Sequence, residues 1–338
     1  MRRGGLFAAS GAVALLAALG ACATEAPATP DLPDAVALSY KTIALAPSDP
    51  KETRVGGLVY RGGLEINSPD GRFGGWSGLI VSADGATLLS QSDEAHWLRA
   101  HLIYDAKGNL SGIDQGQLAG MQNLDGKPMA GKEGDAEGLT SLAPLDTHGS
   151  VFISFERNHR IWEYDLSQSL DAKPSAVPAP GAIKSLESNS GLEGLTQFAP
   201  ATLLAIAETP QDTNGDHPAW LISGTKFETL GVKHHDPYEI SDAAMGPDGN
   251  LYLLERHYFG PIRGVVAAVR EIDRSEIKAG ARAGGHEIAE FTMRENIDNM
   301  EGLSLRRDAS GRTLLYMISD DNYNPVERTV LLMFELVQ

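Results

Sequence analysis

The chain has 338 residues, of which 42% are hydrophobic and 22% are charged, the balance of an ordinary soluble globular protein. Its formal net charge of −17 argues against a nucleic-acid backbone or an anionic lipid surface as the main ligand. A charge of this sign fits a cation-binding surface or simple solubility.

The first 22 residues have the pattern of an export signal. A basic start at Arg2 and Arg3 precedes an uncharged, apolar stretch. The stretch ends in Leu-Gly-Ala-Cys, which resembles the lipobox of bacterial lipoproteins. Cys22 is the only cysteine, so it has no partner for an internal disulfide. We therefore expect Cys22 to be lipidated and the protein to reside in the bacterial periplasm or outer membrane as a lipoprotein. Its only contact with the membrane would be the lipid anchor on Cys22. Ordinary cleavage, giving a secreted soluble protein, is the alternative.

Residues 23–35 are rich in Pro, Ala and Thr and carry no periodic apolar face. This composition predicts a disordered tether. No later stretch has the low complexity of a domain linker, so we expect one domain over residues 36–338. We also expect the protein to be a monomer.

Five similar segments follow one another, and each contains short apolar strands. The clearest unit predicts strands over 139–145, 151–155 and 160–166. The residues aligned before Gly-Leu, or before its equivalent, are separated by 60, 56, 49 and 59 positions and are Ser77, Glu137, Glu193, Asp242 and Glu301. Repeats of this length, each with several strands, predict an all-β protein, a β-propeller with five or six blades.

The last repeat offers only three strands, over 302–305, 313–319 and 329–337. An open ring would leave unpaired backbone groups at its edge. We expect N-terminal strands from 40–47 and 54–67 to complete the final blade and close the ring. A sixth blade would need a divergent unit before Trp76, so five and six blades both remain open.

The acids that recur in the repeats are the candidate functional residues. Those before Gly-Leu should converge at one rim of the channel, and a second set closes the second strands: Asp93, Glu156, Glu208, Glu255 and Asp320. Clustered carboxylates repel unless a cation compensates them, and Ca²⁺ prefers oxygen ligands. We therefore predict Ca²⁺ as cofactor, with ligands among Glu137, Glu193, Asp242, Glu301 and Asp320. The alternative is that these acids accept backbone hydrogen bonds and lock one blade to the next.

The chain has no G-x-S-x-G, H-E-x-x-H, phosphate-binding G-x-x-x-x-G-K or dinucleotide-binding motif. Its repeats, in their order, resemble the phytase-like family, described by its esterase-like activity of phytase; the matching stretches are 73–93, 135–157, 189–196, 242–256 and 300–324. The resemblance implies a secreted propeller that hydrolyses phosphate or carboxylic esters. Ser77 and Thr209 depart from the pattern, the first in place of an acid and the second in place of an arginine.

From these observations we expect a metal-assisted hydrolase acting on a small anionic or ester substrate at the channel mouth. Glu137, Glu193 and Glu301 would bind the metal or order the substrate. Arg157 and Arg256 would face the anionic part of the substrate, and His257 would carry a proton. The alternatives are a non-catalytic envelope propeller that binds a sugar, peptide or protein partner, and a lactonase-like propeller that shares the calcium.

Overall fold

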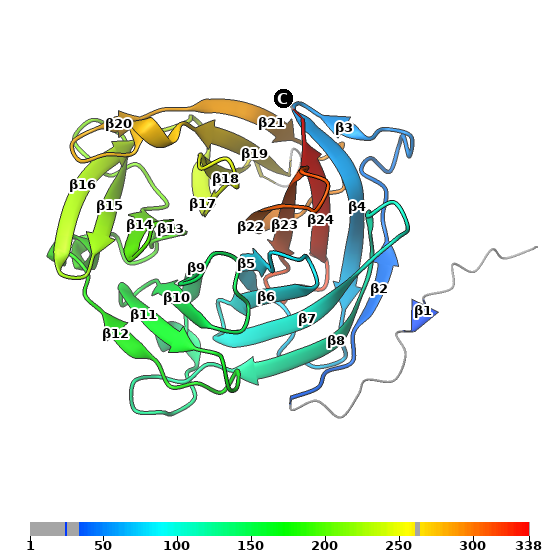
Figure 1. The fold of residues 1–338 in the computed structure, drawn as a ribbon, viewed down its shortest axis with the longest axis horizontal. Coiled ribbons are helices and arrows are strands. Elements are labelled where there is room, and N and C mark those ends of the chain that lie inside the picture. Colours follow the sequence, from blue (N-terminus) through cyan, green and yellow to red (C-terminus); the bar gives the residue numbers. More distant parts are fainter. Residues whose placement is uncertain (1–23, 26–33, 261–263, 338) are drawn as a thin grey trace, which may run out of the picture.

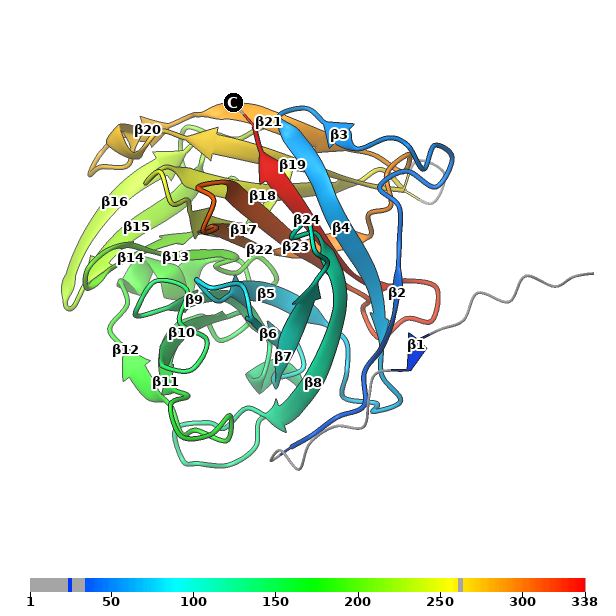
Figure 2. The same ribbon diagram turned by 45° about the vertical axis from the view of Figure 1, so that its right-hand side comes forward.

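The computed structural model describes residues 24–25, 34–260 and 264–337, which form β-strands and three short 3₁₀ helices: η1 (Gly131–Glu133), η2 (Gly181–Ser185) and η3 (Arg274–Glu276). Five sheets stand around a central axis (Figure 1). The predicted β-propeller is thereby confirmed, and it has five blades. The turned view shows the twist of each blade (Figure 2).

The blades follow the chain in order. The first contains β5 (Trp76–Val81), β6 (Thr87–Ser92), β7 (His96–Tyr104) and β8 (Leu110–Gly120). The second contains β9 (Ala136–Ser141), β10 (Ser150–Phe155), β11 (Arg160–Asp165) and β12 (Ser175–Val177). The third contains β13 (Gly194–Ala199), β14 (Thr202–Ile206), β15 (His217–Ser223), β16 (Lys226–Val232) and β20 (Arg282–Ala283). The fourth contains β17 (Glu239–Met245), β18 (Leu251–Tyr258), β19 (Val265–Ile272) and β21 (His286–Phe291).

The fifth blade joins the two ends of the domain. Its C-terminal strands are β22 (Asn299–Arg307), β23 (Thr313–Asp320) and β24 (Thr329–Leu336). Strand β24 pairs with β4 (Leu58–Asn67), which in turn pairs with β2 (Ser39–Thr42) and β3 (Arg54–Val55). The predicted closure by N-terminal strands is therefore confirmed, and segment 54–67 belongs to this blade and not to a sixth.

The second strand of each blade is buried on both faces, because neighbouring blades pack against it. Strand β14, Thr-Leu-Leu-Ala-Ile, is buried from Leu203 to Ile206. Such continuous apolar runs are typical of strands inside a stack of sheets. In blades 1 and 4 the turn before the second strand has an aspartate that accepts the N–H two residues on, Asp84 from Ala86 and Asp248 from Asn250. Short polar turns of this kind set the register of each hairpin.

The predicted signal peptide and Cys22 lie outside the described residues. Within the predicted tether, β1 (Thr24–Glu25) pairs with β2, and the N–H of Leu118 donates to the carbonyl of Asp34. These two contacts involve residues that precede the expected start of the domain at residue 36. Within the described part of the chain, no helix is long and apolar enough to span a membrane.

Candidate metal and substrate site at the acidic end of the channel

The first strand of every blade lines the central channel, and in blades 1, 2, 4 and 5 a β-bulge interrupts it near its start. In blade 5 the pairing shifts between Met300 and Gly302, so Glu301 is the extra residue. Blade 1 shifts in the same place, around Ser77. A bulge redirects the side chain of the extra residue. The acid before Gly-Leu is thus turned by the backbone toward the channel rim.

Blade 4 shows that the alignment of its repeat was wrong by one residue. Its pairing shifts between Ile240 and Asp242, which makes Ser241 the counterpart of Glu301. On the next strand Arg256 pairs with Glu239 as Asp320 pairs with Asn299. Blade 4 therefore presents a serine and an arginine where blade 5 presents two acids.

Asp242 occupies the position of the glycine that recurs in the other repeats, and it has a structural role. It is 1% exposed. Its Oδ2 accepts the N–H of Leu303 in blade 5 at 2.6 Å, and its Oδ1 accepts the N–H of Ala243 at 2.7 Å. Both oxygens accept backbone N–H groups, and the bond to Leu303 locks blade 4 to blade 5, so the prediction of Asp242 as a metal ligand is not carried further.

Glu255, predicted to belong to the ring of second acids, also points elsewhere. It is fully buried and accepts hydrogen bonds from Arg270 Nη2 at 2.5 Å and from His235 Nδ1 at 2.8 Å. Successive side chains of a strand point to opposite faces, so Arg256 takes the rim position.

The remaining predicted acids do gather at the rim, together with one that sequence reasoning did not include as a site residue. The group, which we call the acidic cluster, consists of Asp93, Asp135, Glu137, Glu156, Glu193, Glu208, Glu301 and Asp320. Within it, oxygens of Asp135, Glu137 and Glu156 lie within 4.8 Å of one another, as do those of Glu156, Glu193 and Glu208. Glu156 belongs to both triads. Asp135 directly precedes β9, and the pattern Asp-Ala-Glu at 135–137, which places a second acid two residues before Glu137, was the available signal for it.

Burial and mutual repulsion raise the pKa values of these carboxyl groups. Desolvation, followed by the neighbouring acids, raises the pKa of Glu137 and Glu193 well above the usual range. The same causes raise the pKa of Asp93 and Glu156 to about 7 and that of Glu208 and Asp320 to about 8. Without a cation the cluster is therefore only partly ionised at neutral pH.

Two arginines lie among these acids. Arg256 Nη2 is 3.0 Å from Glu301 Oε1. Burial opposes its charge, but Glu301, Glu208 and Glu193 outweigh that effect and raise its pKa. Arg157 donates to Asp135, and its Nη2 is 3.9 Å from Glu156 Oε2. Two guanidinium groups against eight carboxyl groups leave the cluster undercompensated.

The donors of the acidic cluster fit a hard divalent cation. They are carboxylate oxygens only, and a spread of 4.8 Å can be bridged by Ca²⁺–O bonds of about 2.3–2.6 Å. Among the residues that the structure describes, Asp93 Oδ1 is buried without a hydrogen-bond partner. Backbone locking, the alternative weighed from the sequence, describes Asp242, and backbone N–H groups also reach two acids of the cluster, that of Glu94 reaching Asp93 and that of Gly191 reaching Glu156.

His257 is not brought to the cluster. Its ring packs edge-on against Phe259, with centroids 4.4 Å apart. It follows Arg256 directly on β18 and therefore lies on the other face of that strand. We do not retain it as a proton carrier.

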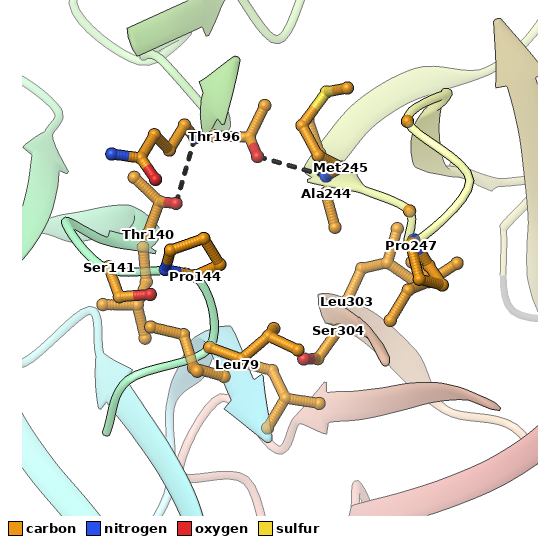
Figure 3. A pocket seen from close by; sticks show the side chains of 18 of the residues that line it. Leu79, Thr140, Ser141, Pro144, Thr196, Ala244, Met245, Pro247, Leu303 and Ser304 are labelled. Atoms are coloured by element: carbon orange, nitrogen blue, oxygen red, sulfur yellow. Dashed lines mark hydrogen bonds between the residues drawn. The ribbon is translucent and has the colours of Figure 1, made fainter. Parts of the chain in front are cut away.

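The opposite end of the channel is apolar (Figure 3). A cavity of ≈ 340 Å³ lies there, and Leu79, Met245 and Leu303 are among its walls. Thr140 Oγ1 and Thr196 Oγ1 accept N–H groups of the next blade, from Gln197 at 3.1 Å and Met245 at 3.2 Å. None of the described residues that line it is Asp or Glu. The Gly-Leu-Thr or Gly-Leu-Ser that recurs in the repeats supplies these apolar and hydroxyl side chains, and we did not use this pattern to predict the cavity.

A family model described as "Phytase-like: Esterase-like activity of phytase" matches residues 71–323. The comparison with curated proteins gave no match. Among solved structures, a PQQ-bound aldose sugar dehydrogenase from Streptomyces coelicolor is 14% identical, with a TM-score of 0.40, over 91% of this chain and 99% of that one. The propeller domain of Cps50 (Swd1) from Myceliophteria thermophila is 10% identical, with a TM-score of 0.41, over 93% and 99%.

Proposed function

The chain belongs to the phytase-like family, and from this premise we propose that it hydrolyses phosphate or carboxylic esters at its acidic cluster, with a bound divalent cation, Ca²⁺, as cofactor. The observation that carries the proposal is the pair of carboxylate triads that share Glu156. They lie at the end of the channel where the first strands of the blades begin.

Five residues would hold the cation: Asp135, Glu137, Glu156, Glu193 and Glu208. Of the ligands proposed from the sequence, Glu137 and Glu193 belong to these triads, whereas Glu301 and Asp320 stand beside them. When bound, such an ion polarises an ester oxygen and lowers the pKa of a coordinated water.

Arg256 is the group that best fits the anionic part of a substrate. Glu301 fixes its Nη2, and its Nε is buried without a hydrogen-bond partner among the described residues. A guanidinium held in this way binds phosphate or carboxylate oxygens with defined geometry. Arg157, by contrast, is engaged with Asp135, so we assign it to charge compensation.

We also propose that the protein is exported and held at a bacterial membrane by lipid on Cys22. The support is the sequence alone: a basic start, an apolar stretch and a lipobox around the single cysteine. An anchored propeller would meet its substrates outside the cytoplasm.

Hydrolysis of p-nitrophenyl acetate and p-nitrophenyl phosphate, with Ca²⁺ or with EGTA, tests the function. We expect turnover that EGTA abolishes and that Glu137→Gln lowers at least tenfold, because a ligand of the cation is lost. The matched control is Glu228→Gln, which removes a carboxylate from an exposed pair with Lys226. Full activity of Glu137→Gln would refute the assignment. Calcium binding without turnover of any ester would favour the non-catalytic alternative.

A further inference from the structure

A second cavity opens directly beside the acidic cluster. It has a volume of ≈ 850 Å³ and shares Arg256 and Glu301 with the proposed site. This volume lies within the range of small-molecule sites, roughly 300–1,000 Å³. The cavity is therefore placed to receive the part of a substrate that extends from the reacting ester group.

One wall of this cavity is unusually apolar for an exposed surface. Tyr258 is 58% exposed, Met293 62% and Val326 81%, and all three line it. They are three of the seven large hydrophobic side chains that are exposed in the described chain. Exposed apolar side chains that gather in one concave place mark a binding surface, whereas scattered ones need no explanation.

Met293 lies against the backbone of Gly264. Gly264 also lines the cavity and has φ +68°. A Cβ at Gly264 would lie 2.5 Å from Met293 Sδ, so the methionine packs closely against this glycine. The two residues therefore face each other across this part of the cavity wall.

The charged residues of the cavity leave no cation for a second anionic group. Arg328 Nε is 3.1 Å from Asp298 Oδ2, and its Nη1 and Nη2 donate to Asn296 and to the Ile297 carbonyl. Glu327 accepts from Asn322 Nδ2 at 2.7 Å. With Asp298 and Glu327 in the wall, a substrate that carries further phosphates beyond the reacting group would be repelled.

We propose that this cavity selects esters whose remaining group is uncharged and apolar, an aryl or medium-length alkyl group, and disfavours polyphosphorylated substrates. The proposal rests on the proposed function, since it assigns the substrate class of that same site. The ester group lies at Arg256 and the acidic cluster, and the apolar group lies against Tyr258, Met293 and Val326.

The test compares kcat/KM for benzyl and ethyl esters, as acetates or as phosphates according to which ester the protein cleaves. We expect a preference for benzyl of about tenfold or more, from the burial of a phenyl ring against the apolar wall. The double variant Met293→Ser, Val326→Ser should lose most of this preference and keep its rate on the ethyl ester. Phe227→Ser, which removes an exposed aromatic ring on β16, is the matched control and should keep the preference.

A binding measurement separates failure of this inference from failure of the proposed function. Calorimetric titration with benzylphosphonate and ethylphosphonate needs no turnover. Tighter binding of benzylphosphonate, lost in the double variant, supports the cavity even if no ester is hydrolysed. Equal kcat/KM for the two esters, or a benzyl preference that the double variant retains, would overturn the inference while leaving the hydrolase intact.

Discussion

Substitution of Glu156 by glutamine tests the acidic cluster most sharply, because this residue belongs to both triads. Glu156 is 6% exposed, and burial, followed by the charge of Asp135, raises the pKa of its carboxyl group from 4.5 to about 7. Such a rise costs the folded, metal-free protein at most about 3 kcal/mol at a pH above both values. Glutamine keeps the shape and removes the ionisation.

The sign of the effect follows from proton binding. The folded state holds the proton of Glu156 more tightly than the unfolded state, so metal-free stability falls as the pH rises from about 4.5 to about 7. At pH 8 in EGTA we therefore expect Glu156→Gln to melt higher than the parent protein, by about 2–6 °C for a domain of this size. At pH 5 the difference should be smaller.

With Ca²⁺ bound, the parent protein should melt at a higher temperature than Glu156→Gln. The parent protein gains stability from the ion by mass action, and the variant, which lacks the shared ligand, gains much less. Thermal melts followed by circular dichroism give the melting temperature of each protein under four conditions, at pH 5 and 8 with EGTA or Ca²⁺. Glu228→Gln is the control. An equal calcium-induced rise in the melting temperature of parent and variant would refute the role of Glu156. A melting temperature of the variant below that of the parent protein, in EGTA at pH 8, would refute the claim that the ionised Glu156 carboxylate destabilises the metal-free fold.

Three further predictions concern other parts of the molecule. Asp242→Ala leaves the buried Leu303 N–H without its acceptor and should lower the free energy of unfolding, measured in urea, by about 1–3 kcal/mol. Calcium affinity should not change, and a loss of calcium affinity would show that Asp242 is a metal ligand. Arg256→Met should raise KM for anionic esters about tenfold or more in steady-state assays, and an unchanged KM would exclude it as the anion contact. Mass spectrometry of the N-terminal peptide should find lipid on Cys22 and none after Cys22→Ser, whereas an unmodified Cys22 in the parent protein would favour ordinary cleavage.

The fold could be predicted because each blade repeats the same sequence pattern. Acid, Gly-Leu and paired apolar runs recur at similar spacing, and a ring must close on its own first strands. The number of blades was not decided, because segment 54–67 carries strand patterning without the features of a repeat. The structure shows why: β4 completes the last blade and lines no part of the channel rim as a first strand.

The site was predictable only in part, since it depends on register. In a strand a slip of one residue exchanges the two faces. The similarity of Leu-Glu-Arg in blade 4 to Phe-Glu-Arg in blade 2 suggested that Glu255 and Arg256 match Glu156 and Arg157. The bulge in β17 makes Arg256 the counterpart of an acid instead, and this supplies the cluster with its buried cation. Bulges are set by backbone pairing, which a single repeat does not reveal.

The most direct test of the account is anomalous diffraction from crystals grown with Mn²⁺ or Ca²⁺. We expect a peak within bonding distance of Glu156 and of either Glu193 and Glu208 or Asp135 and Glu137. Crystals without a peak at the acidic cluster, grown at millimolar metal and neutral pH, would contradict the proposed cation site.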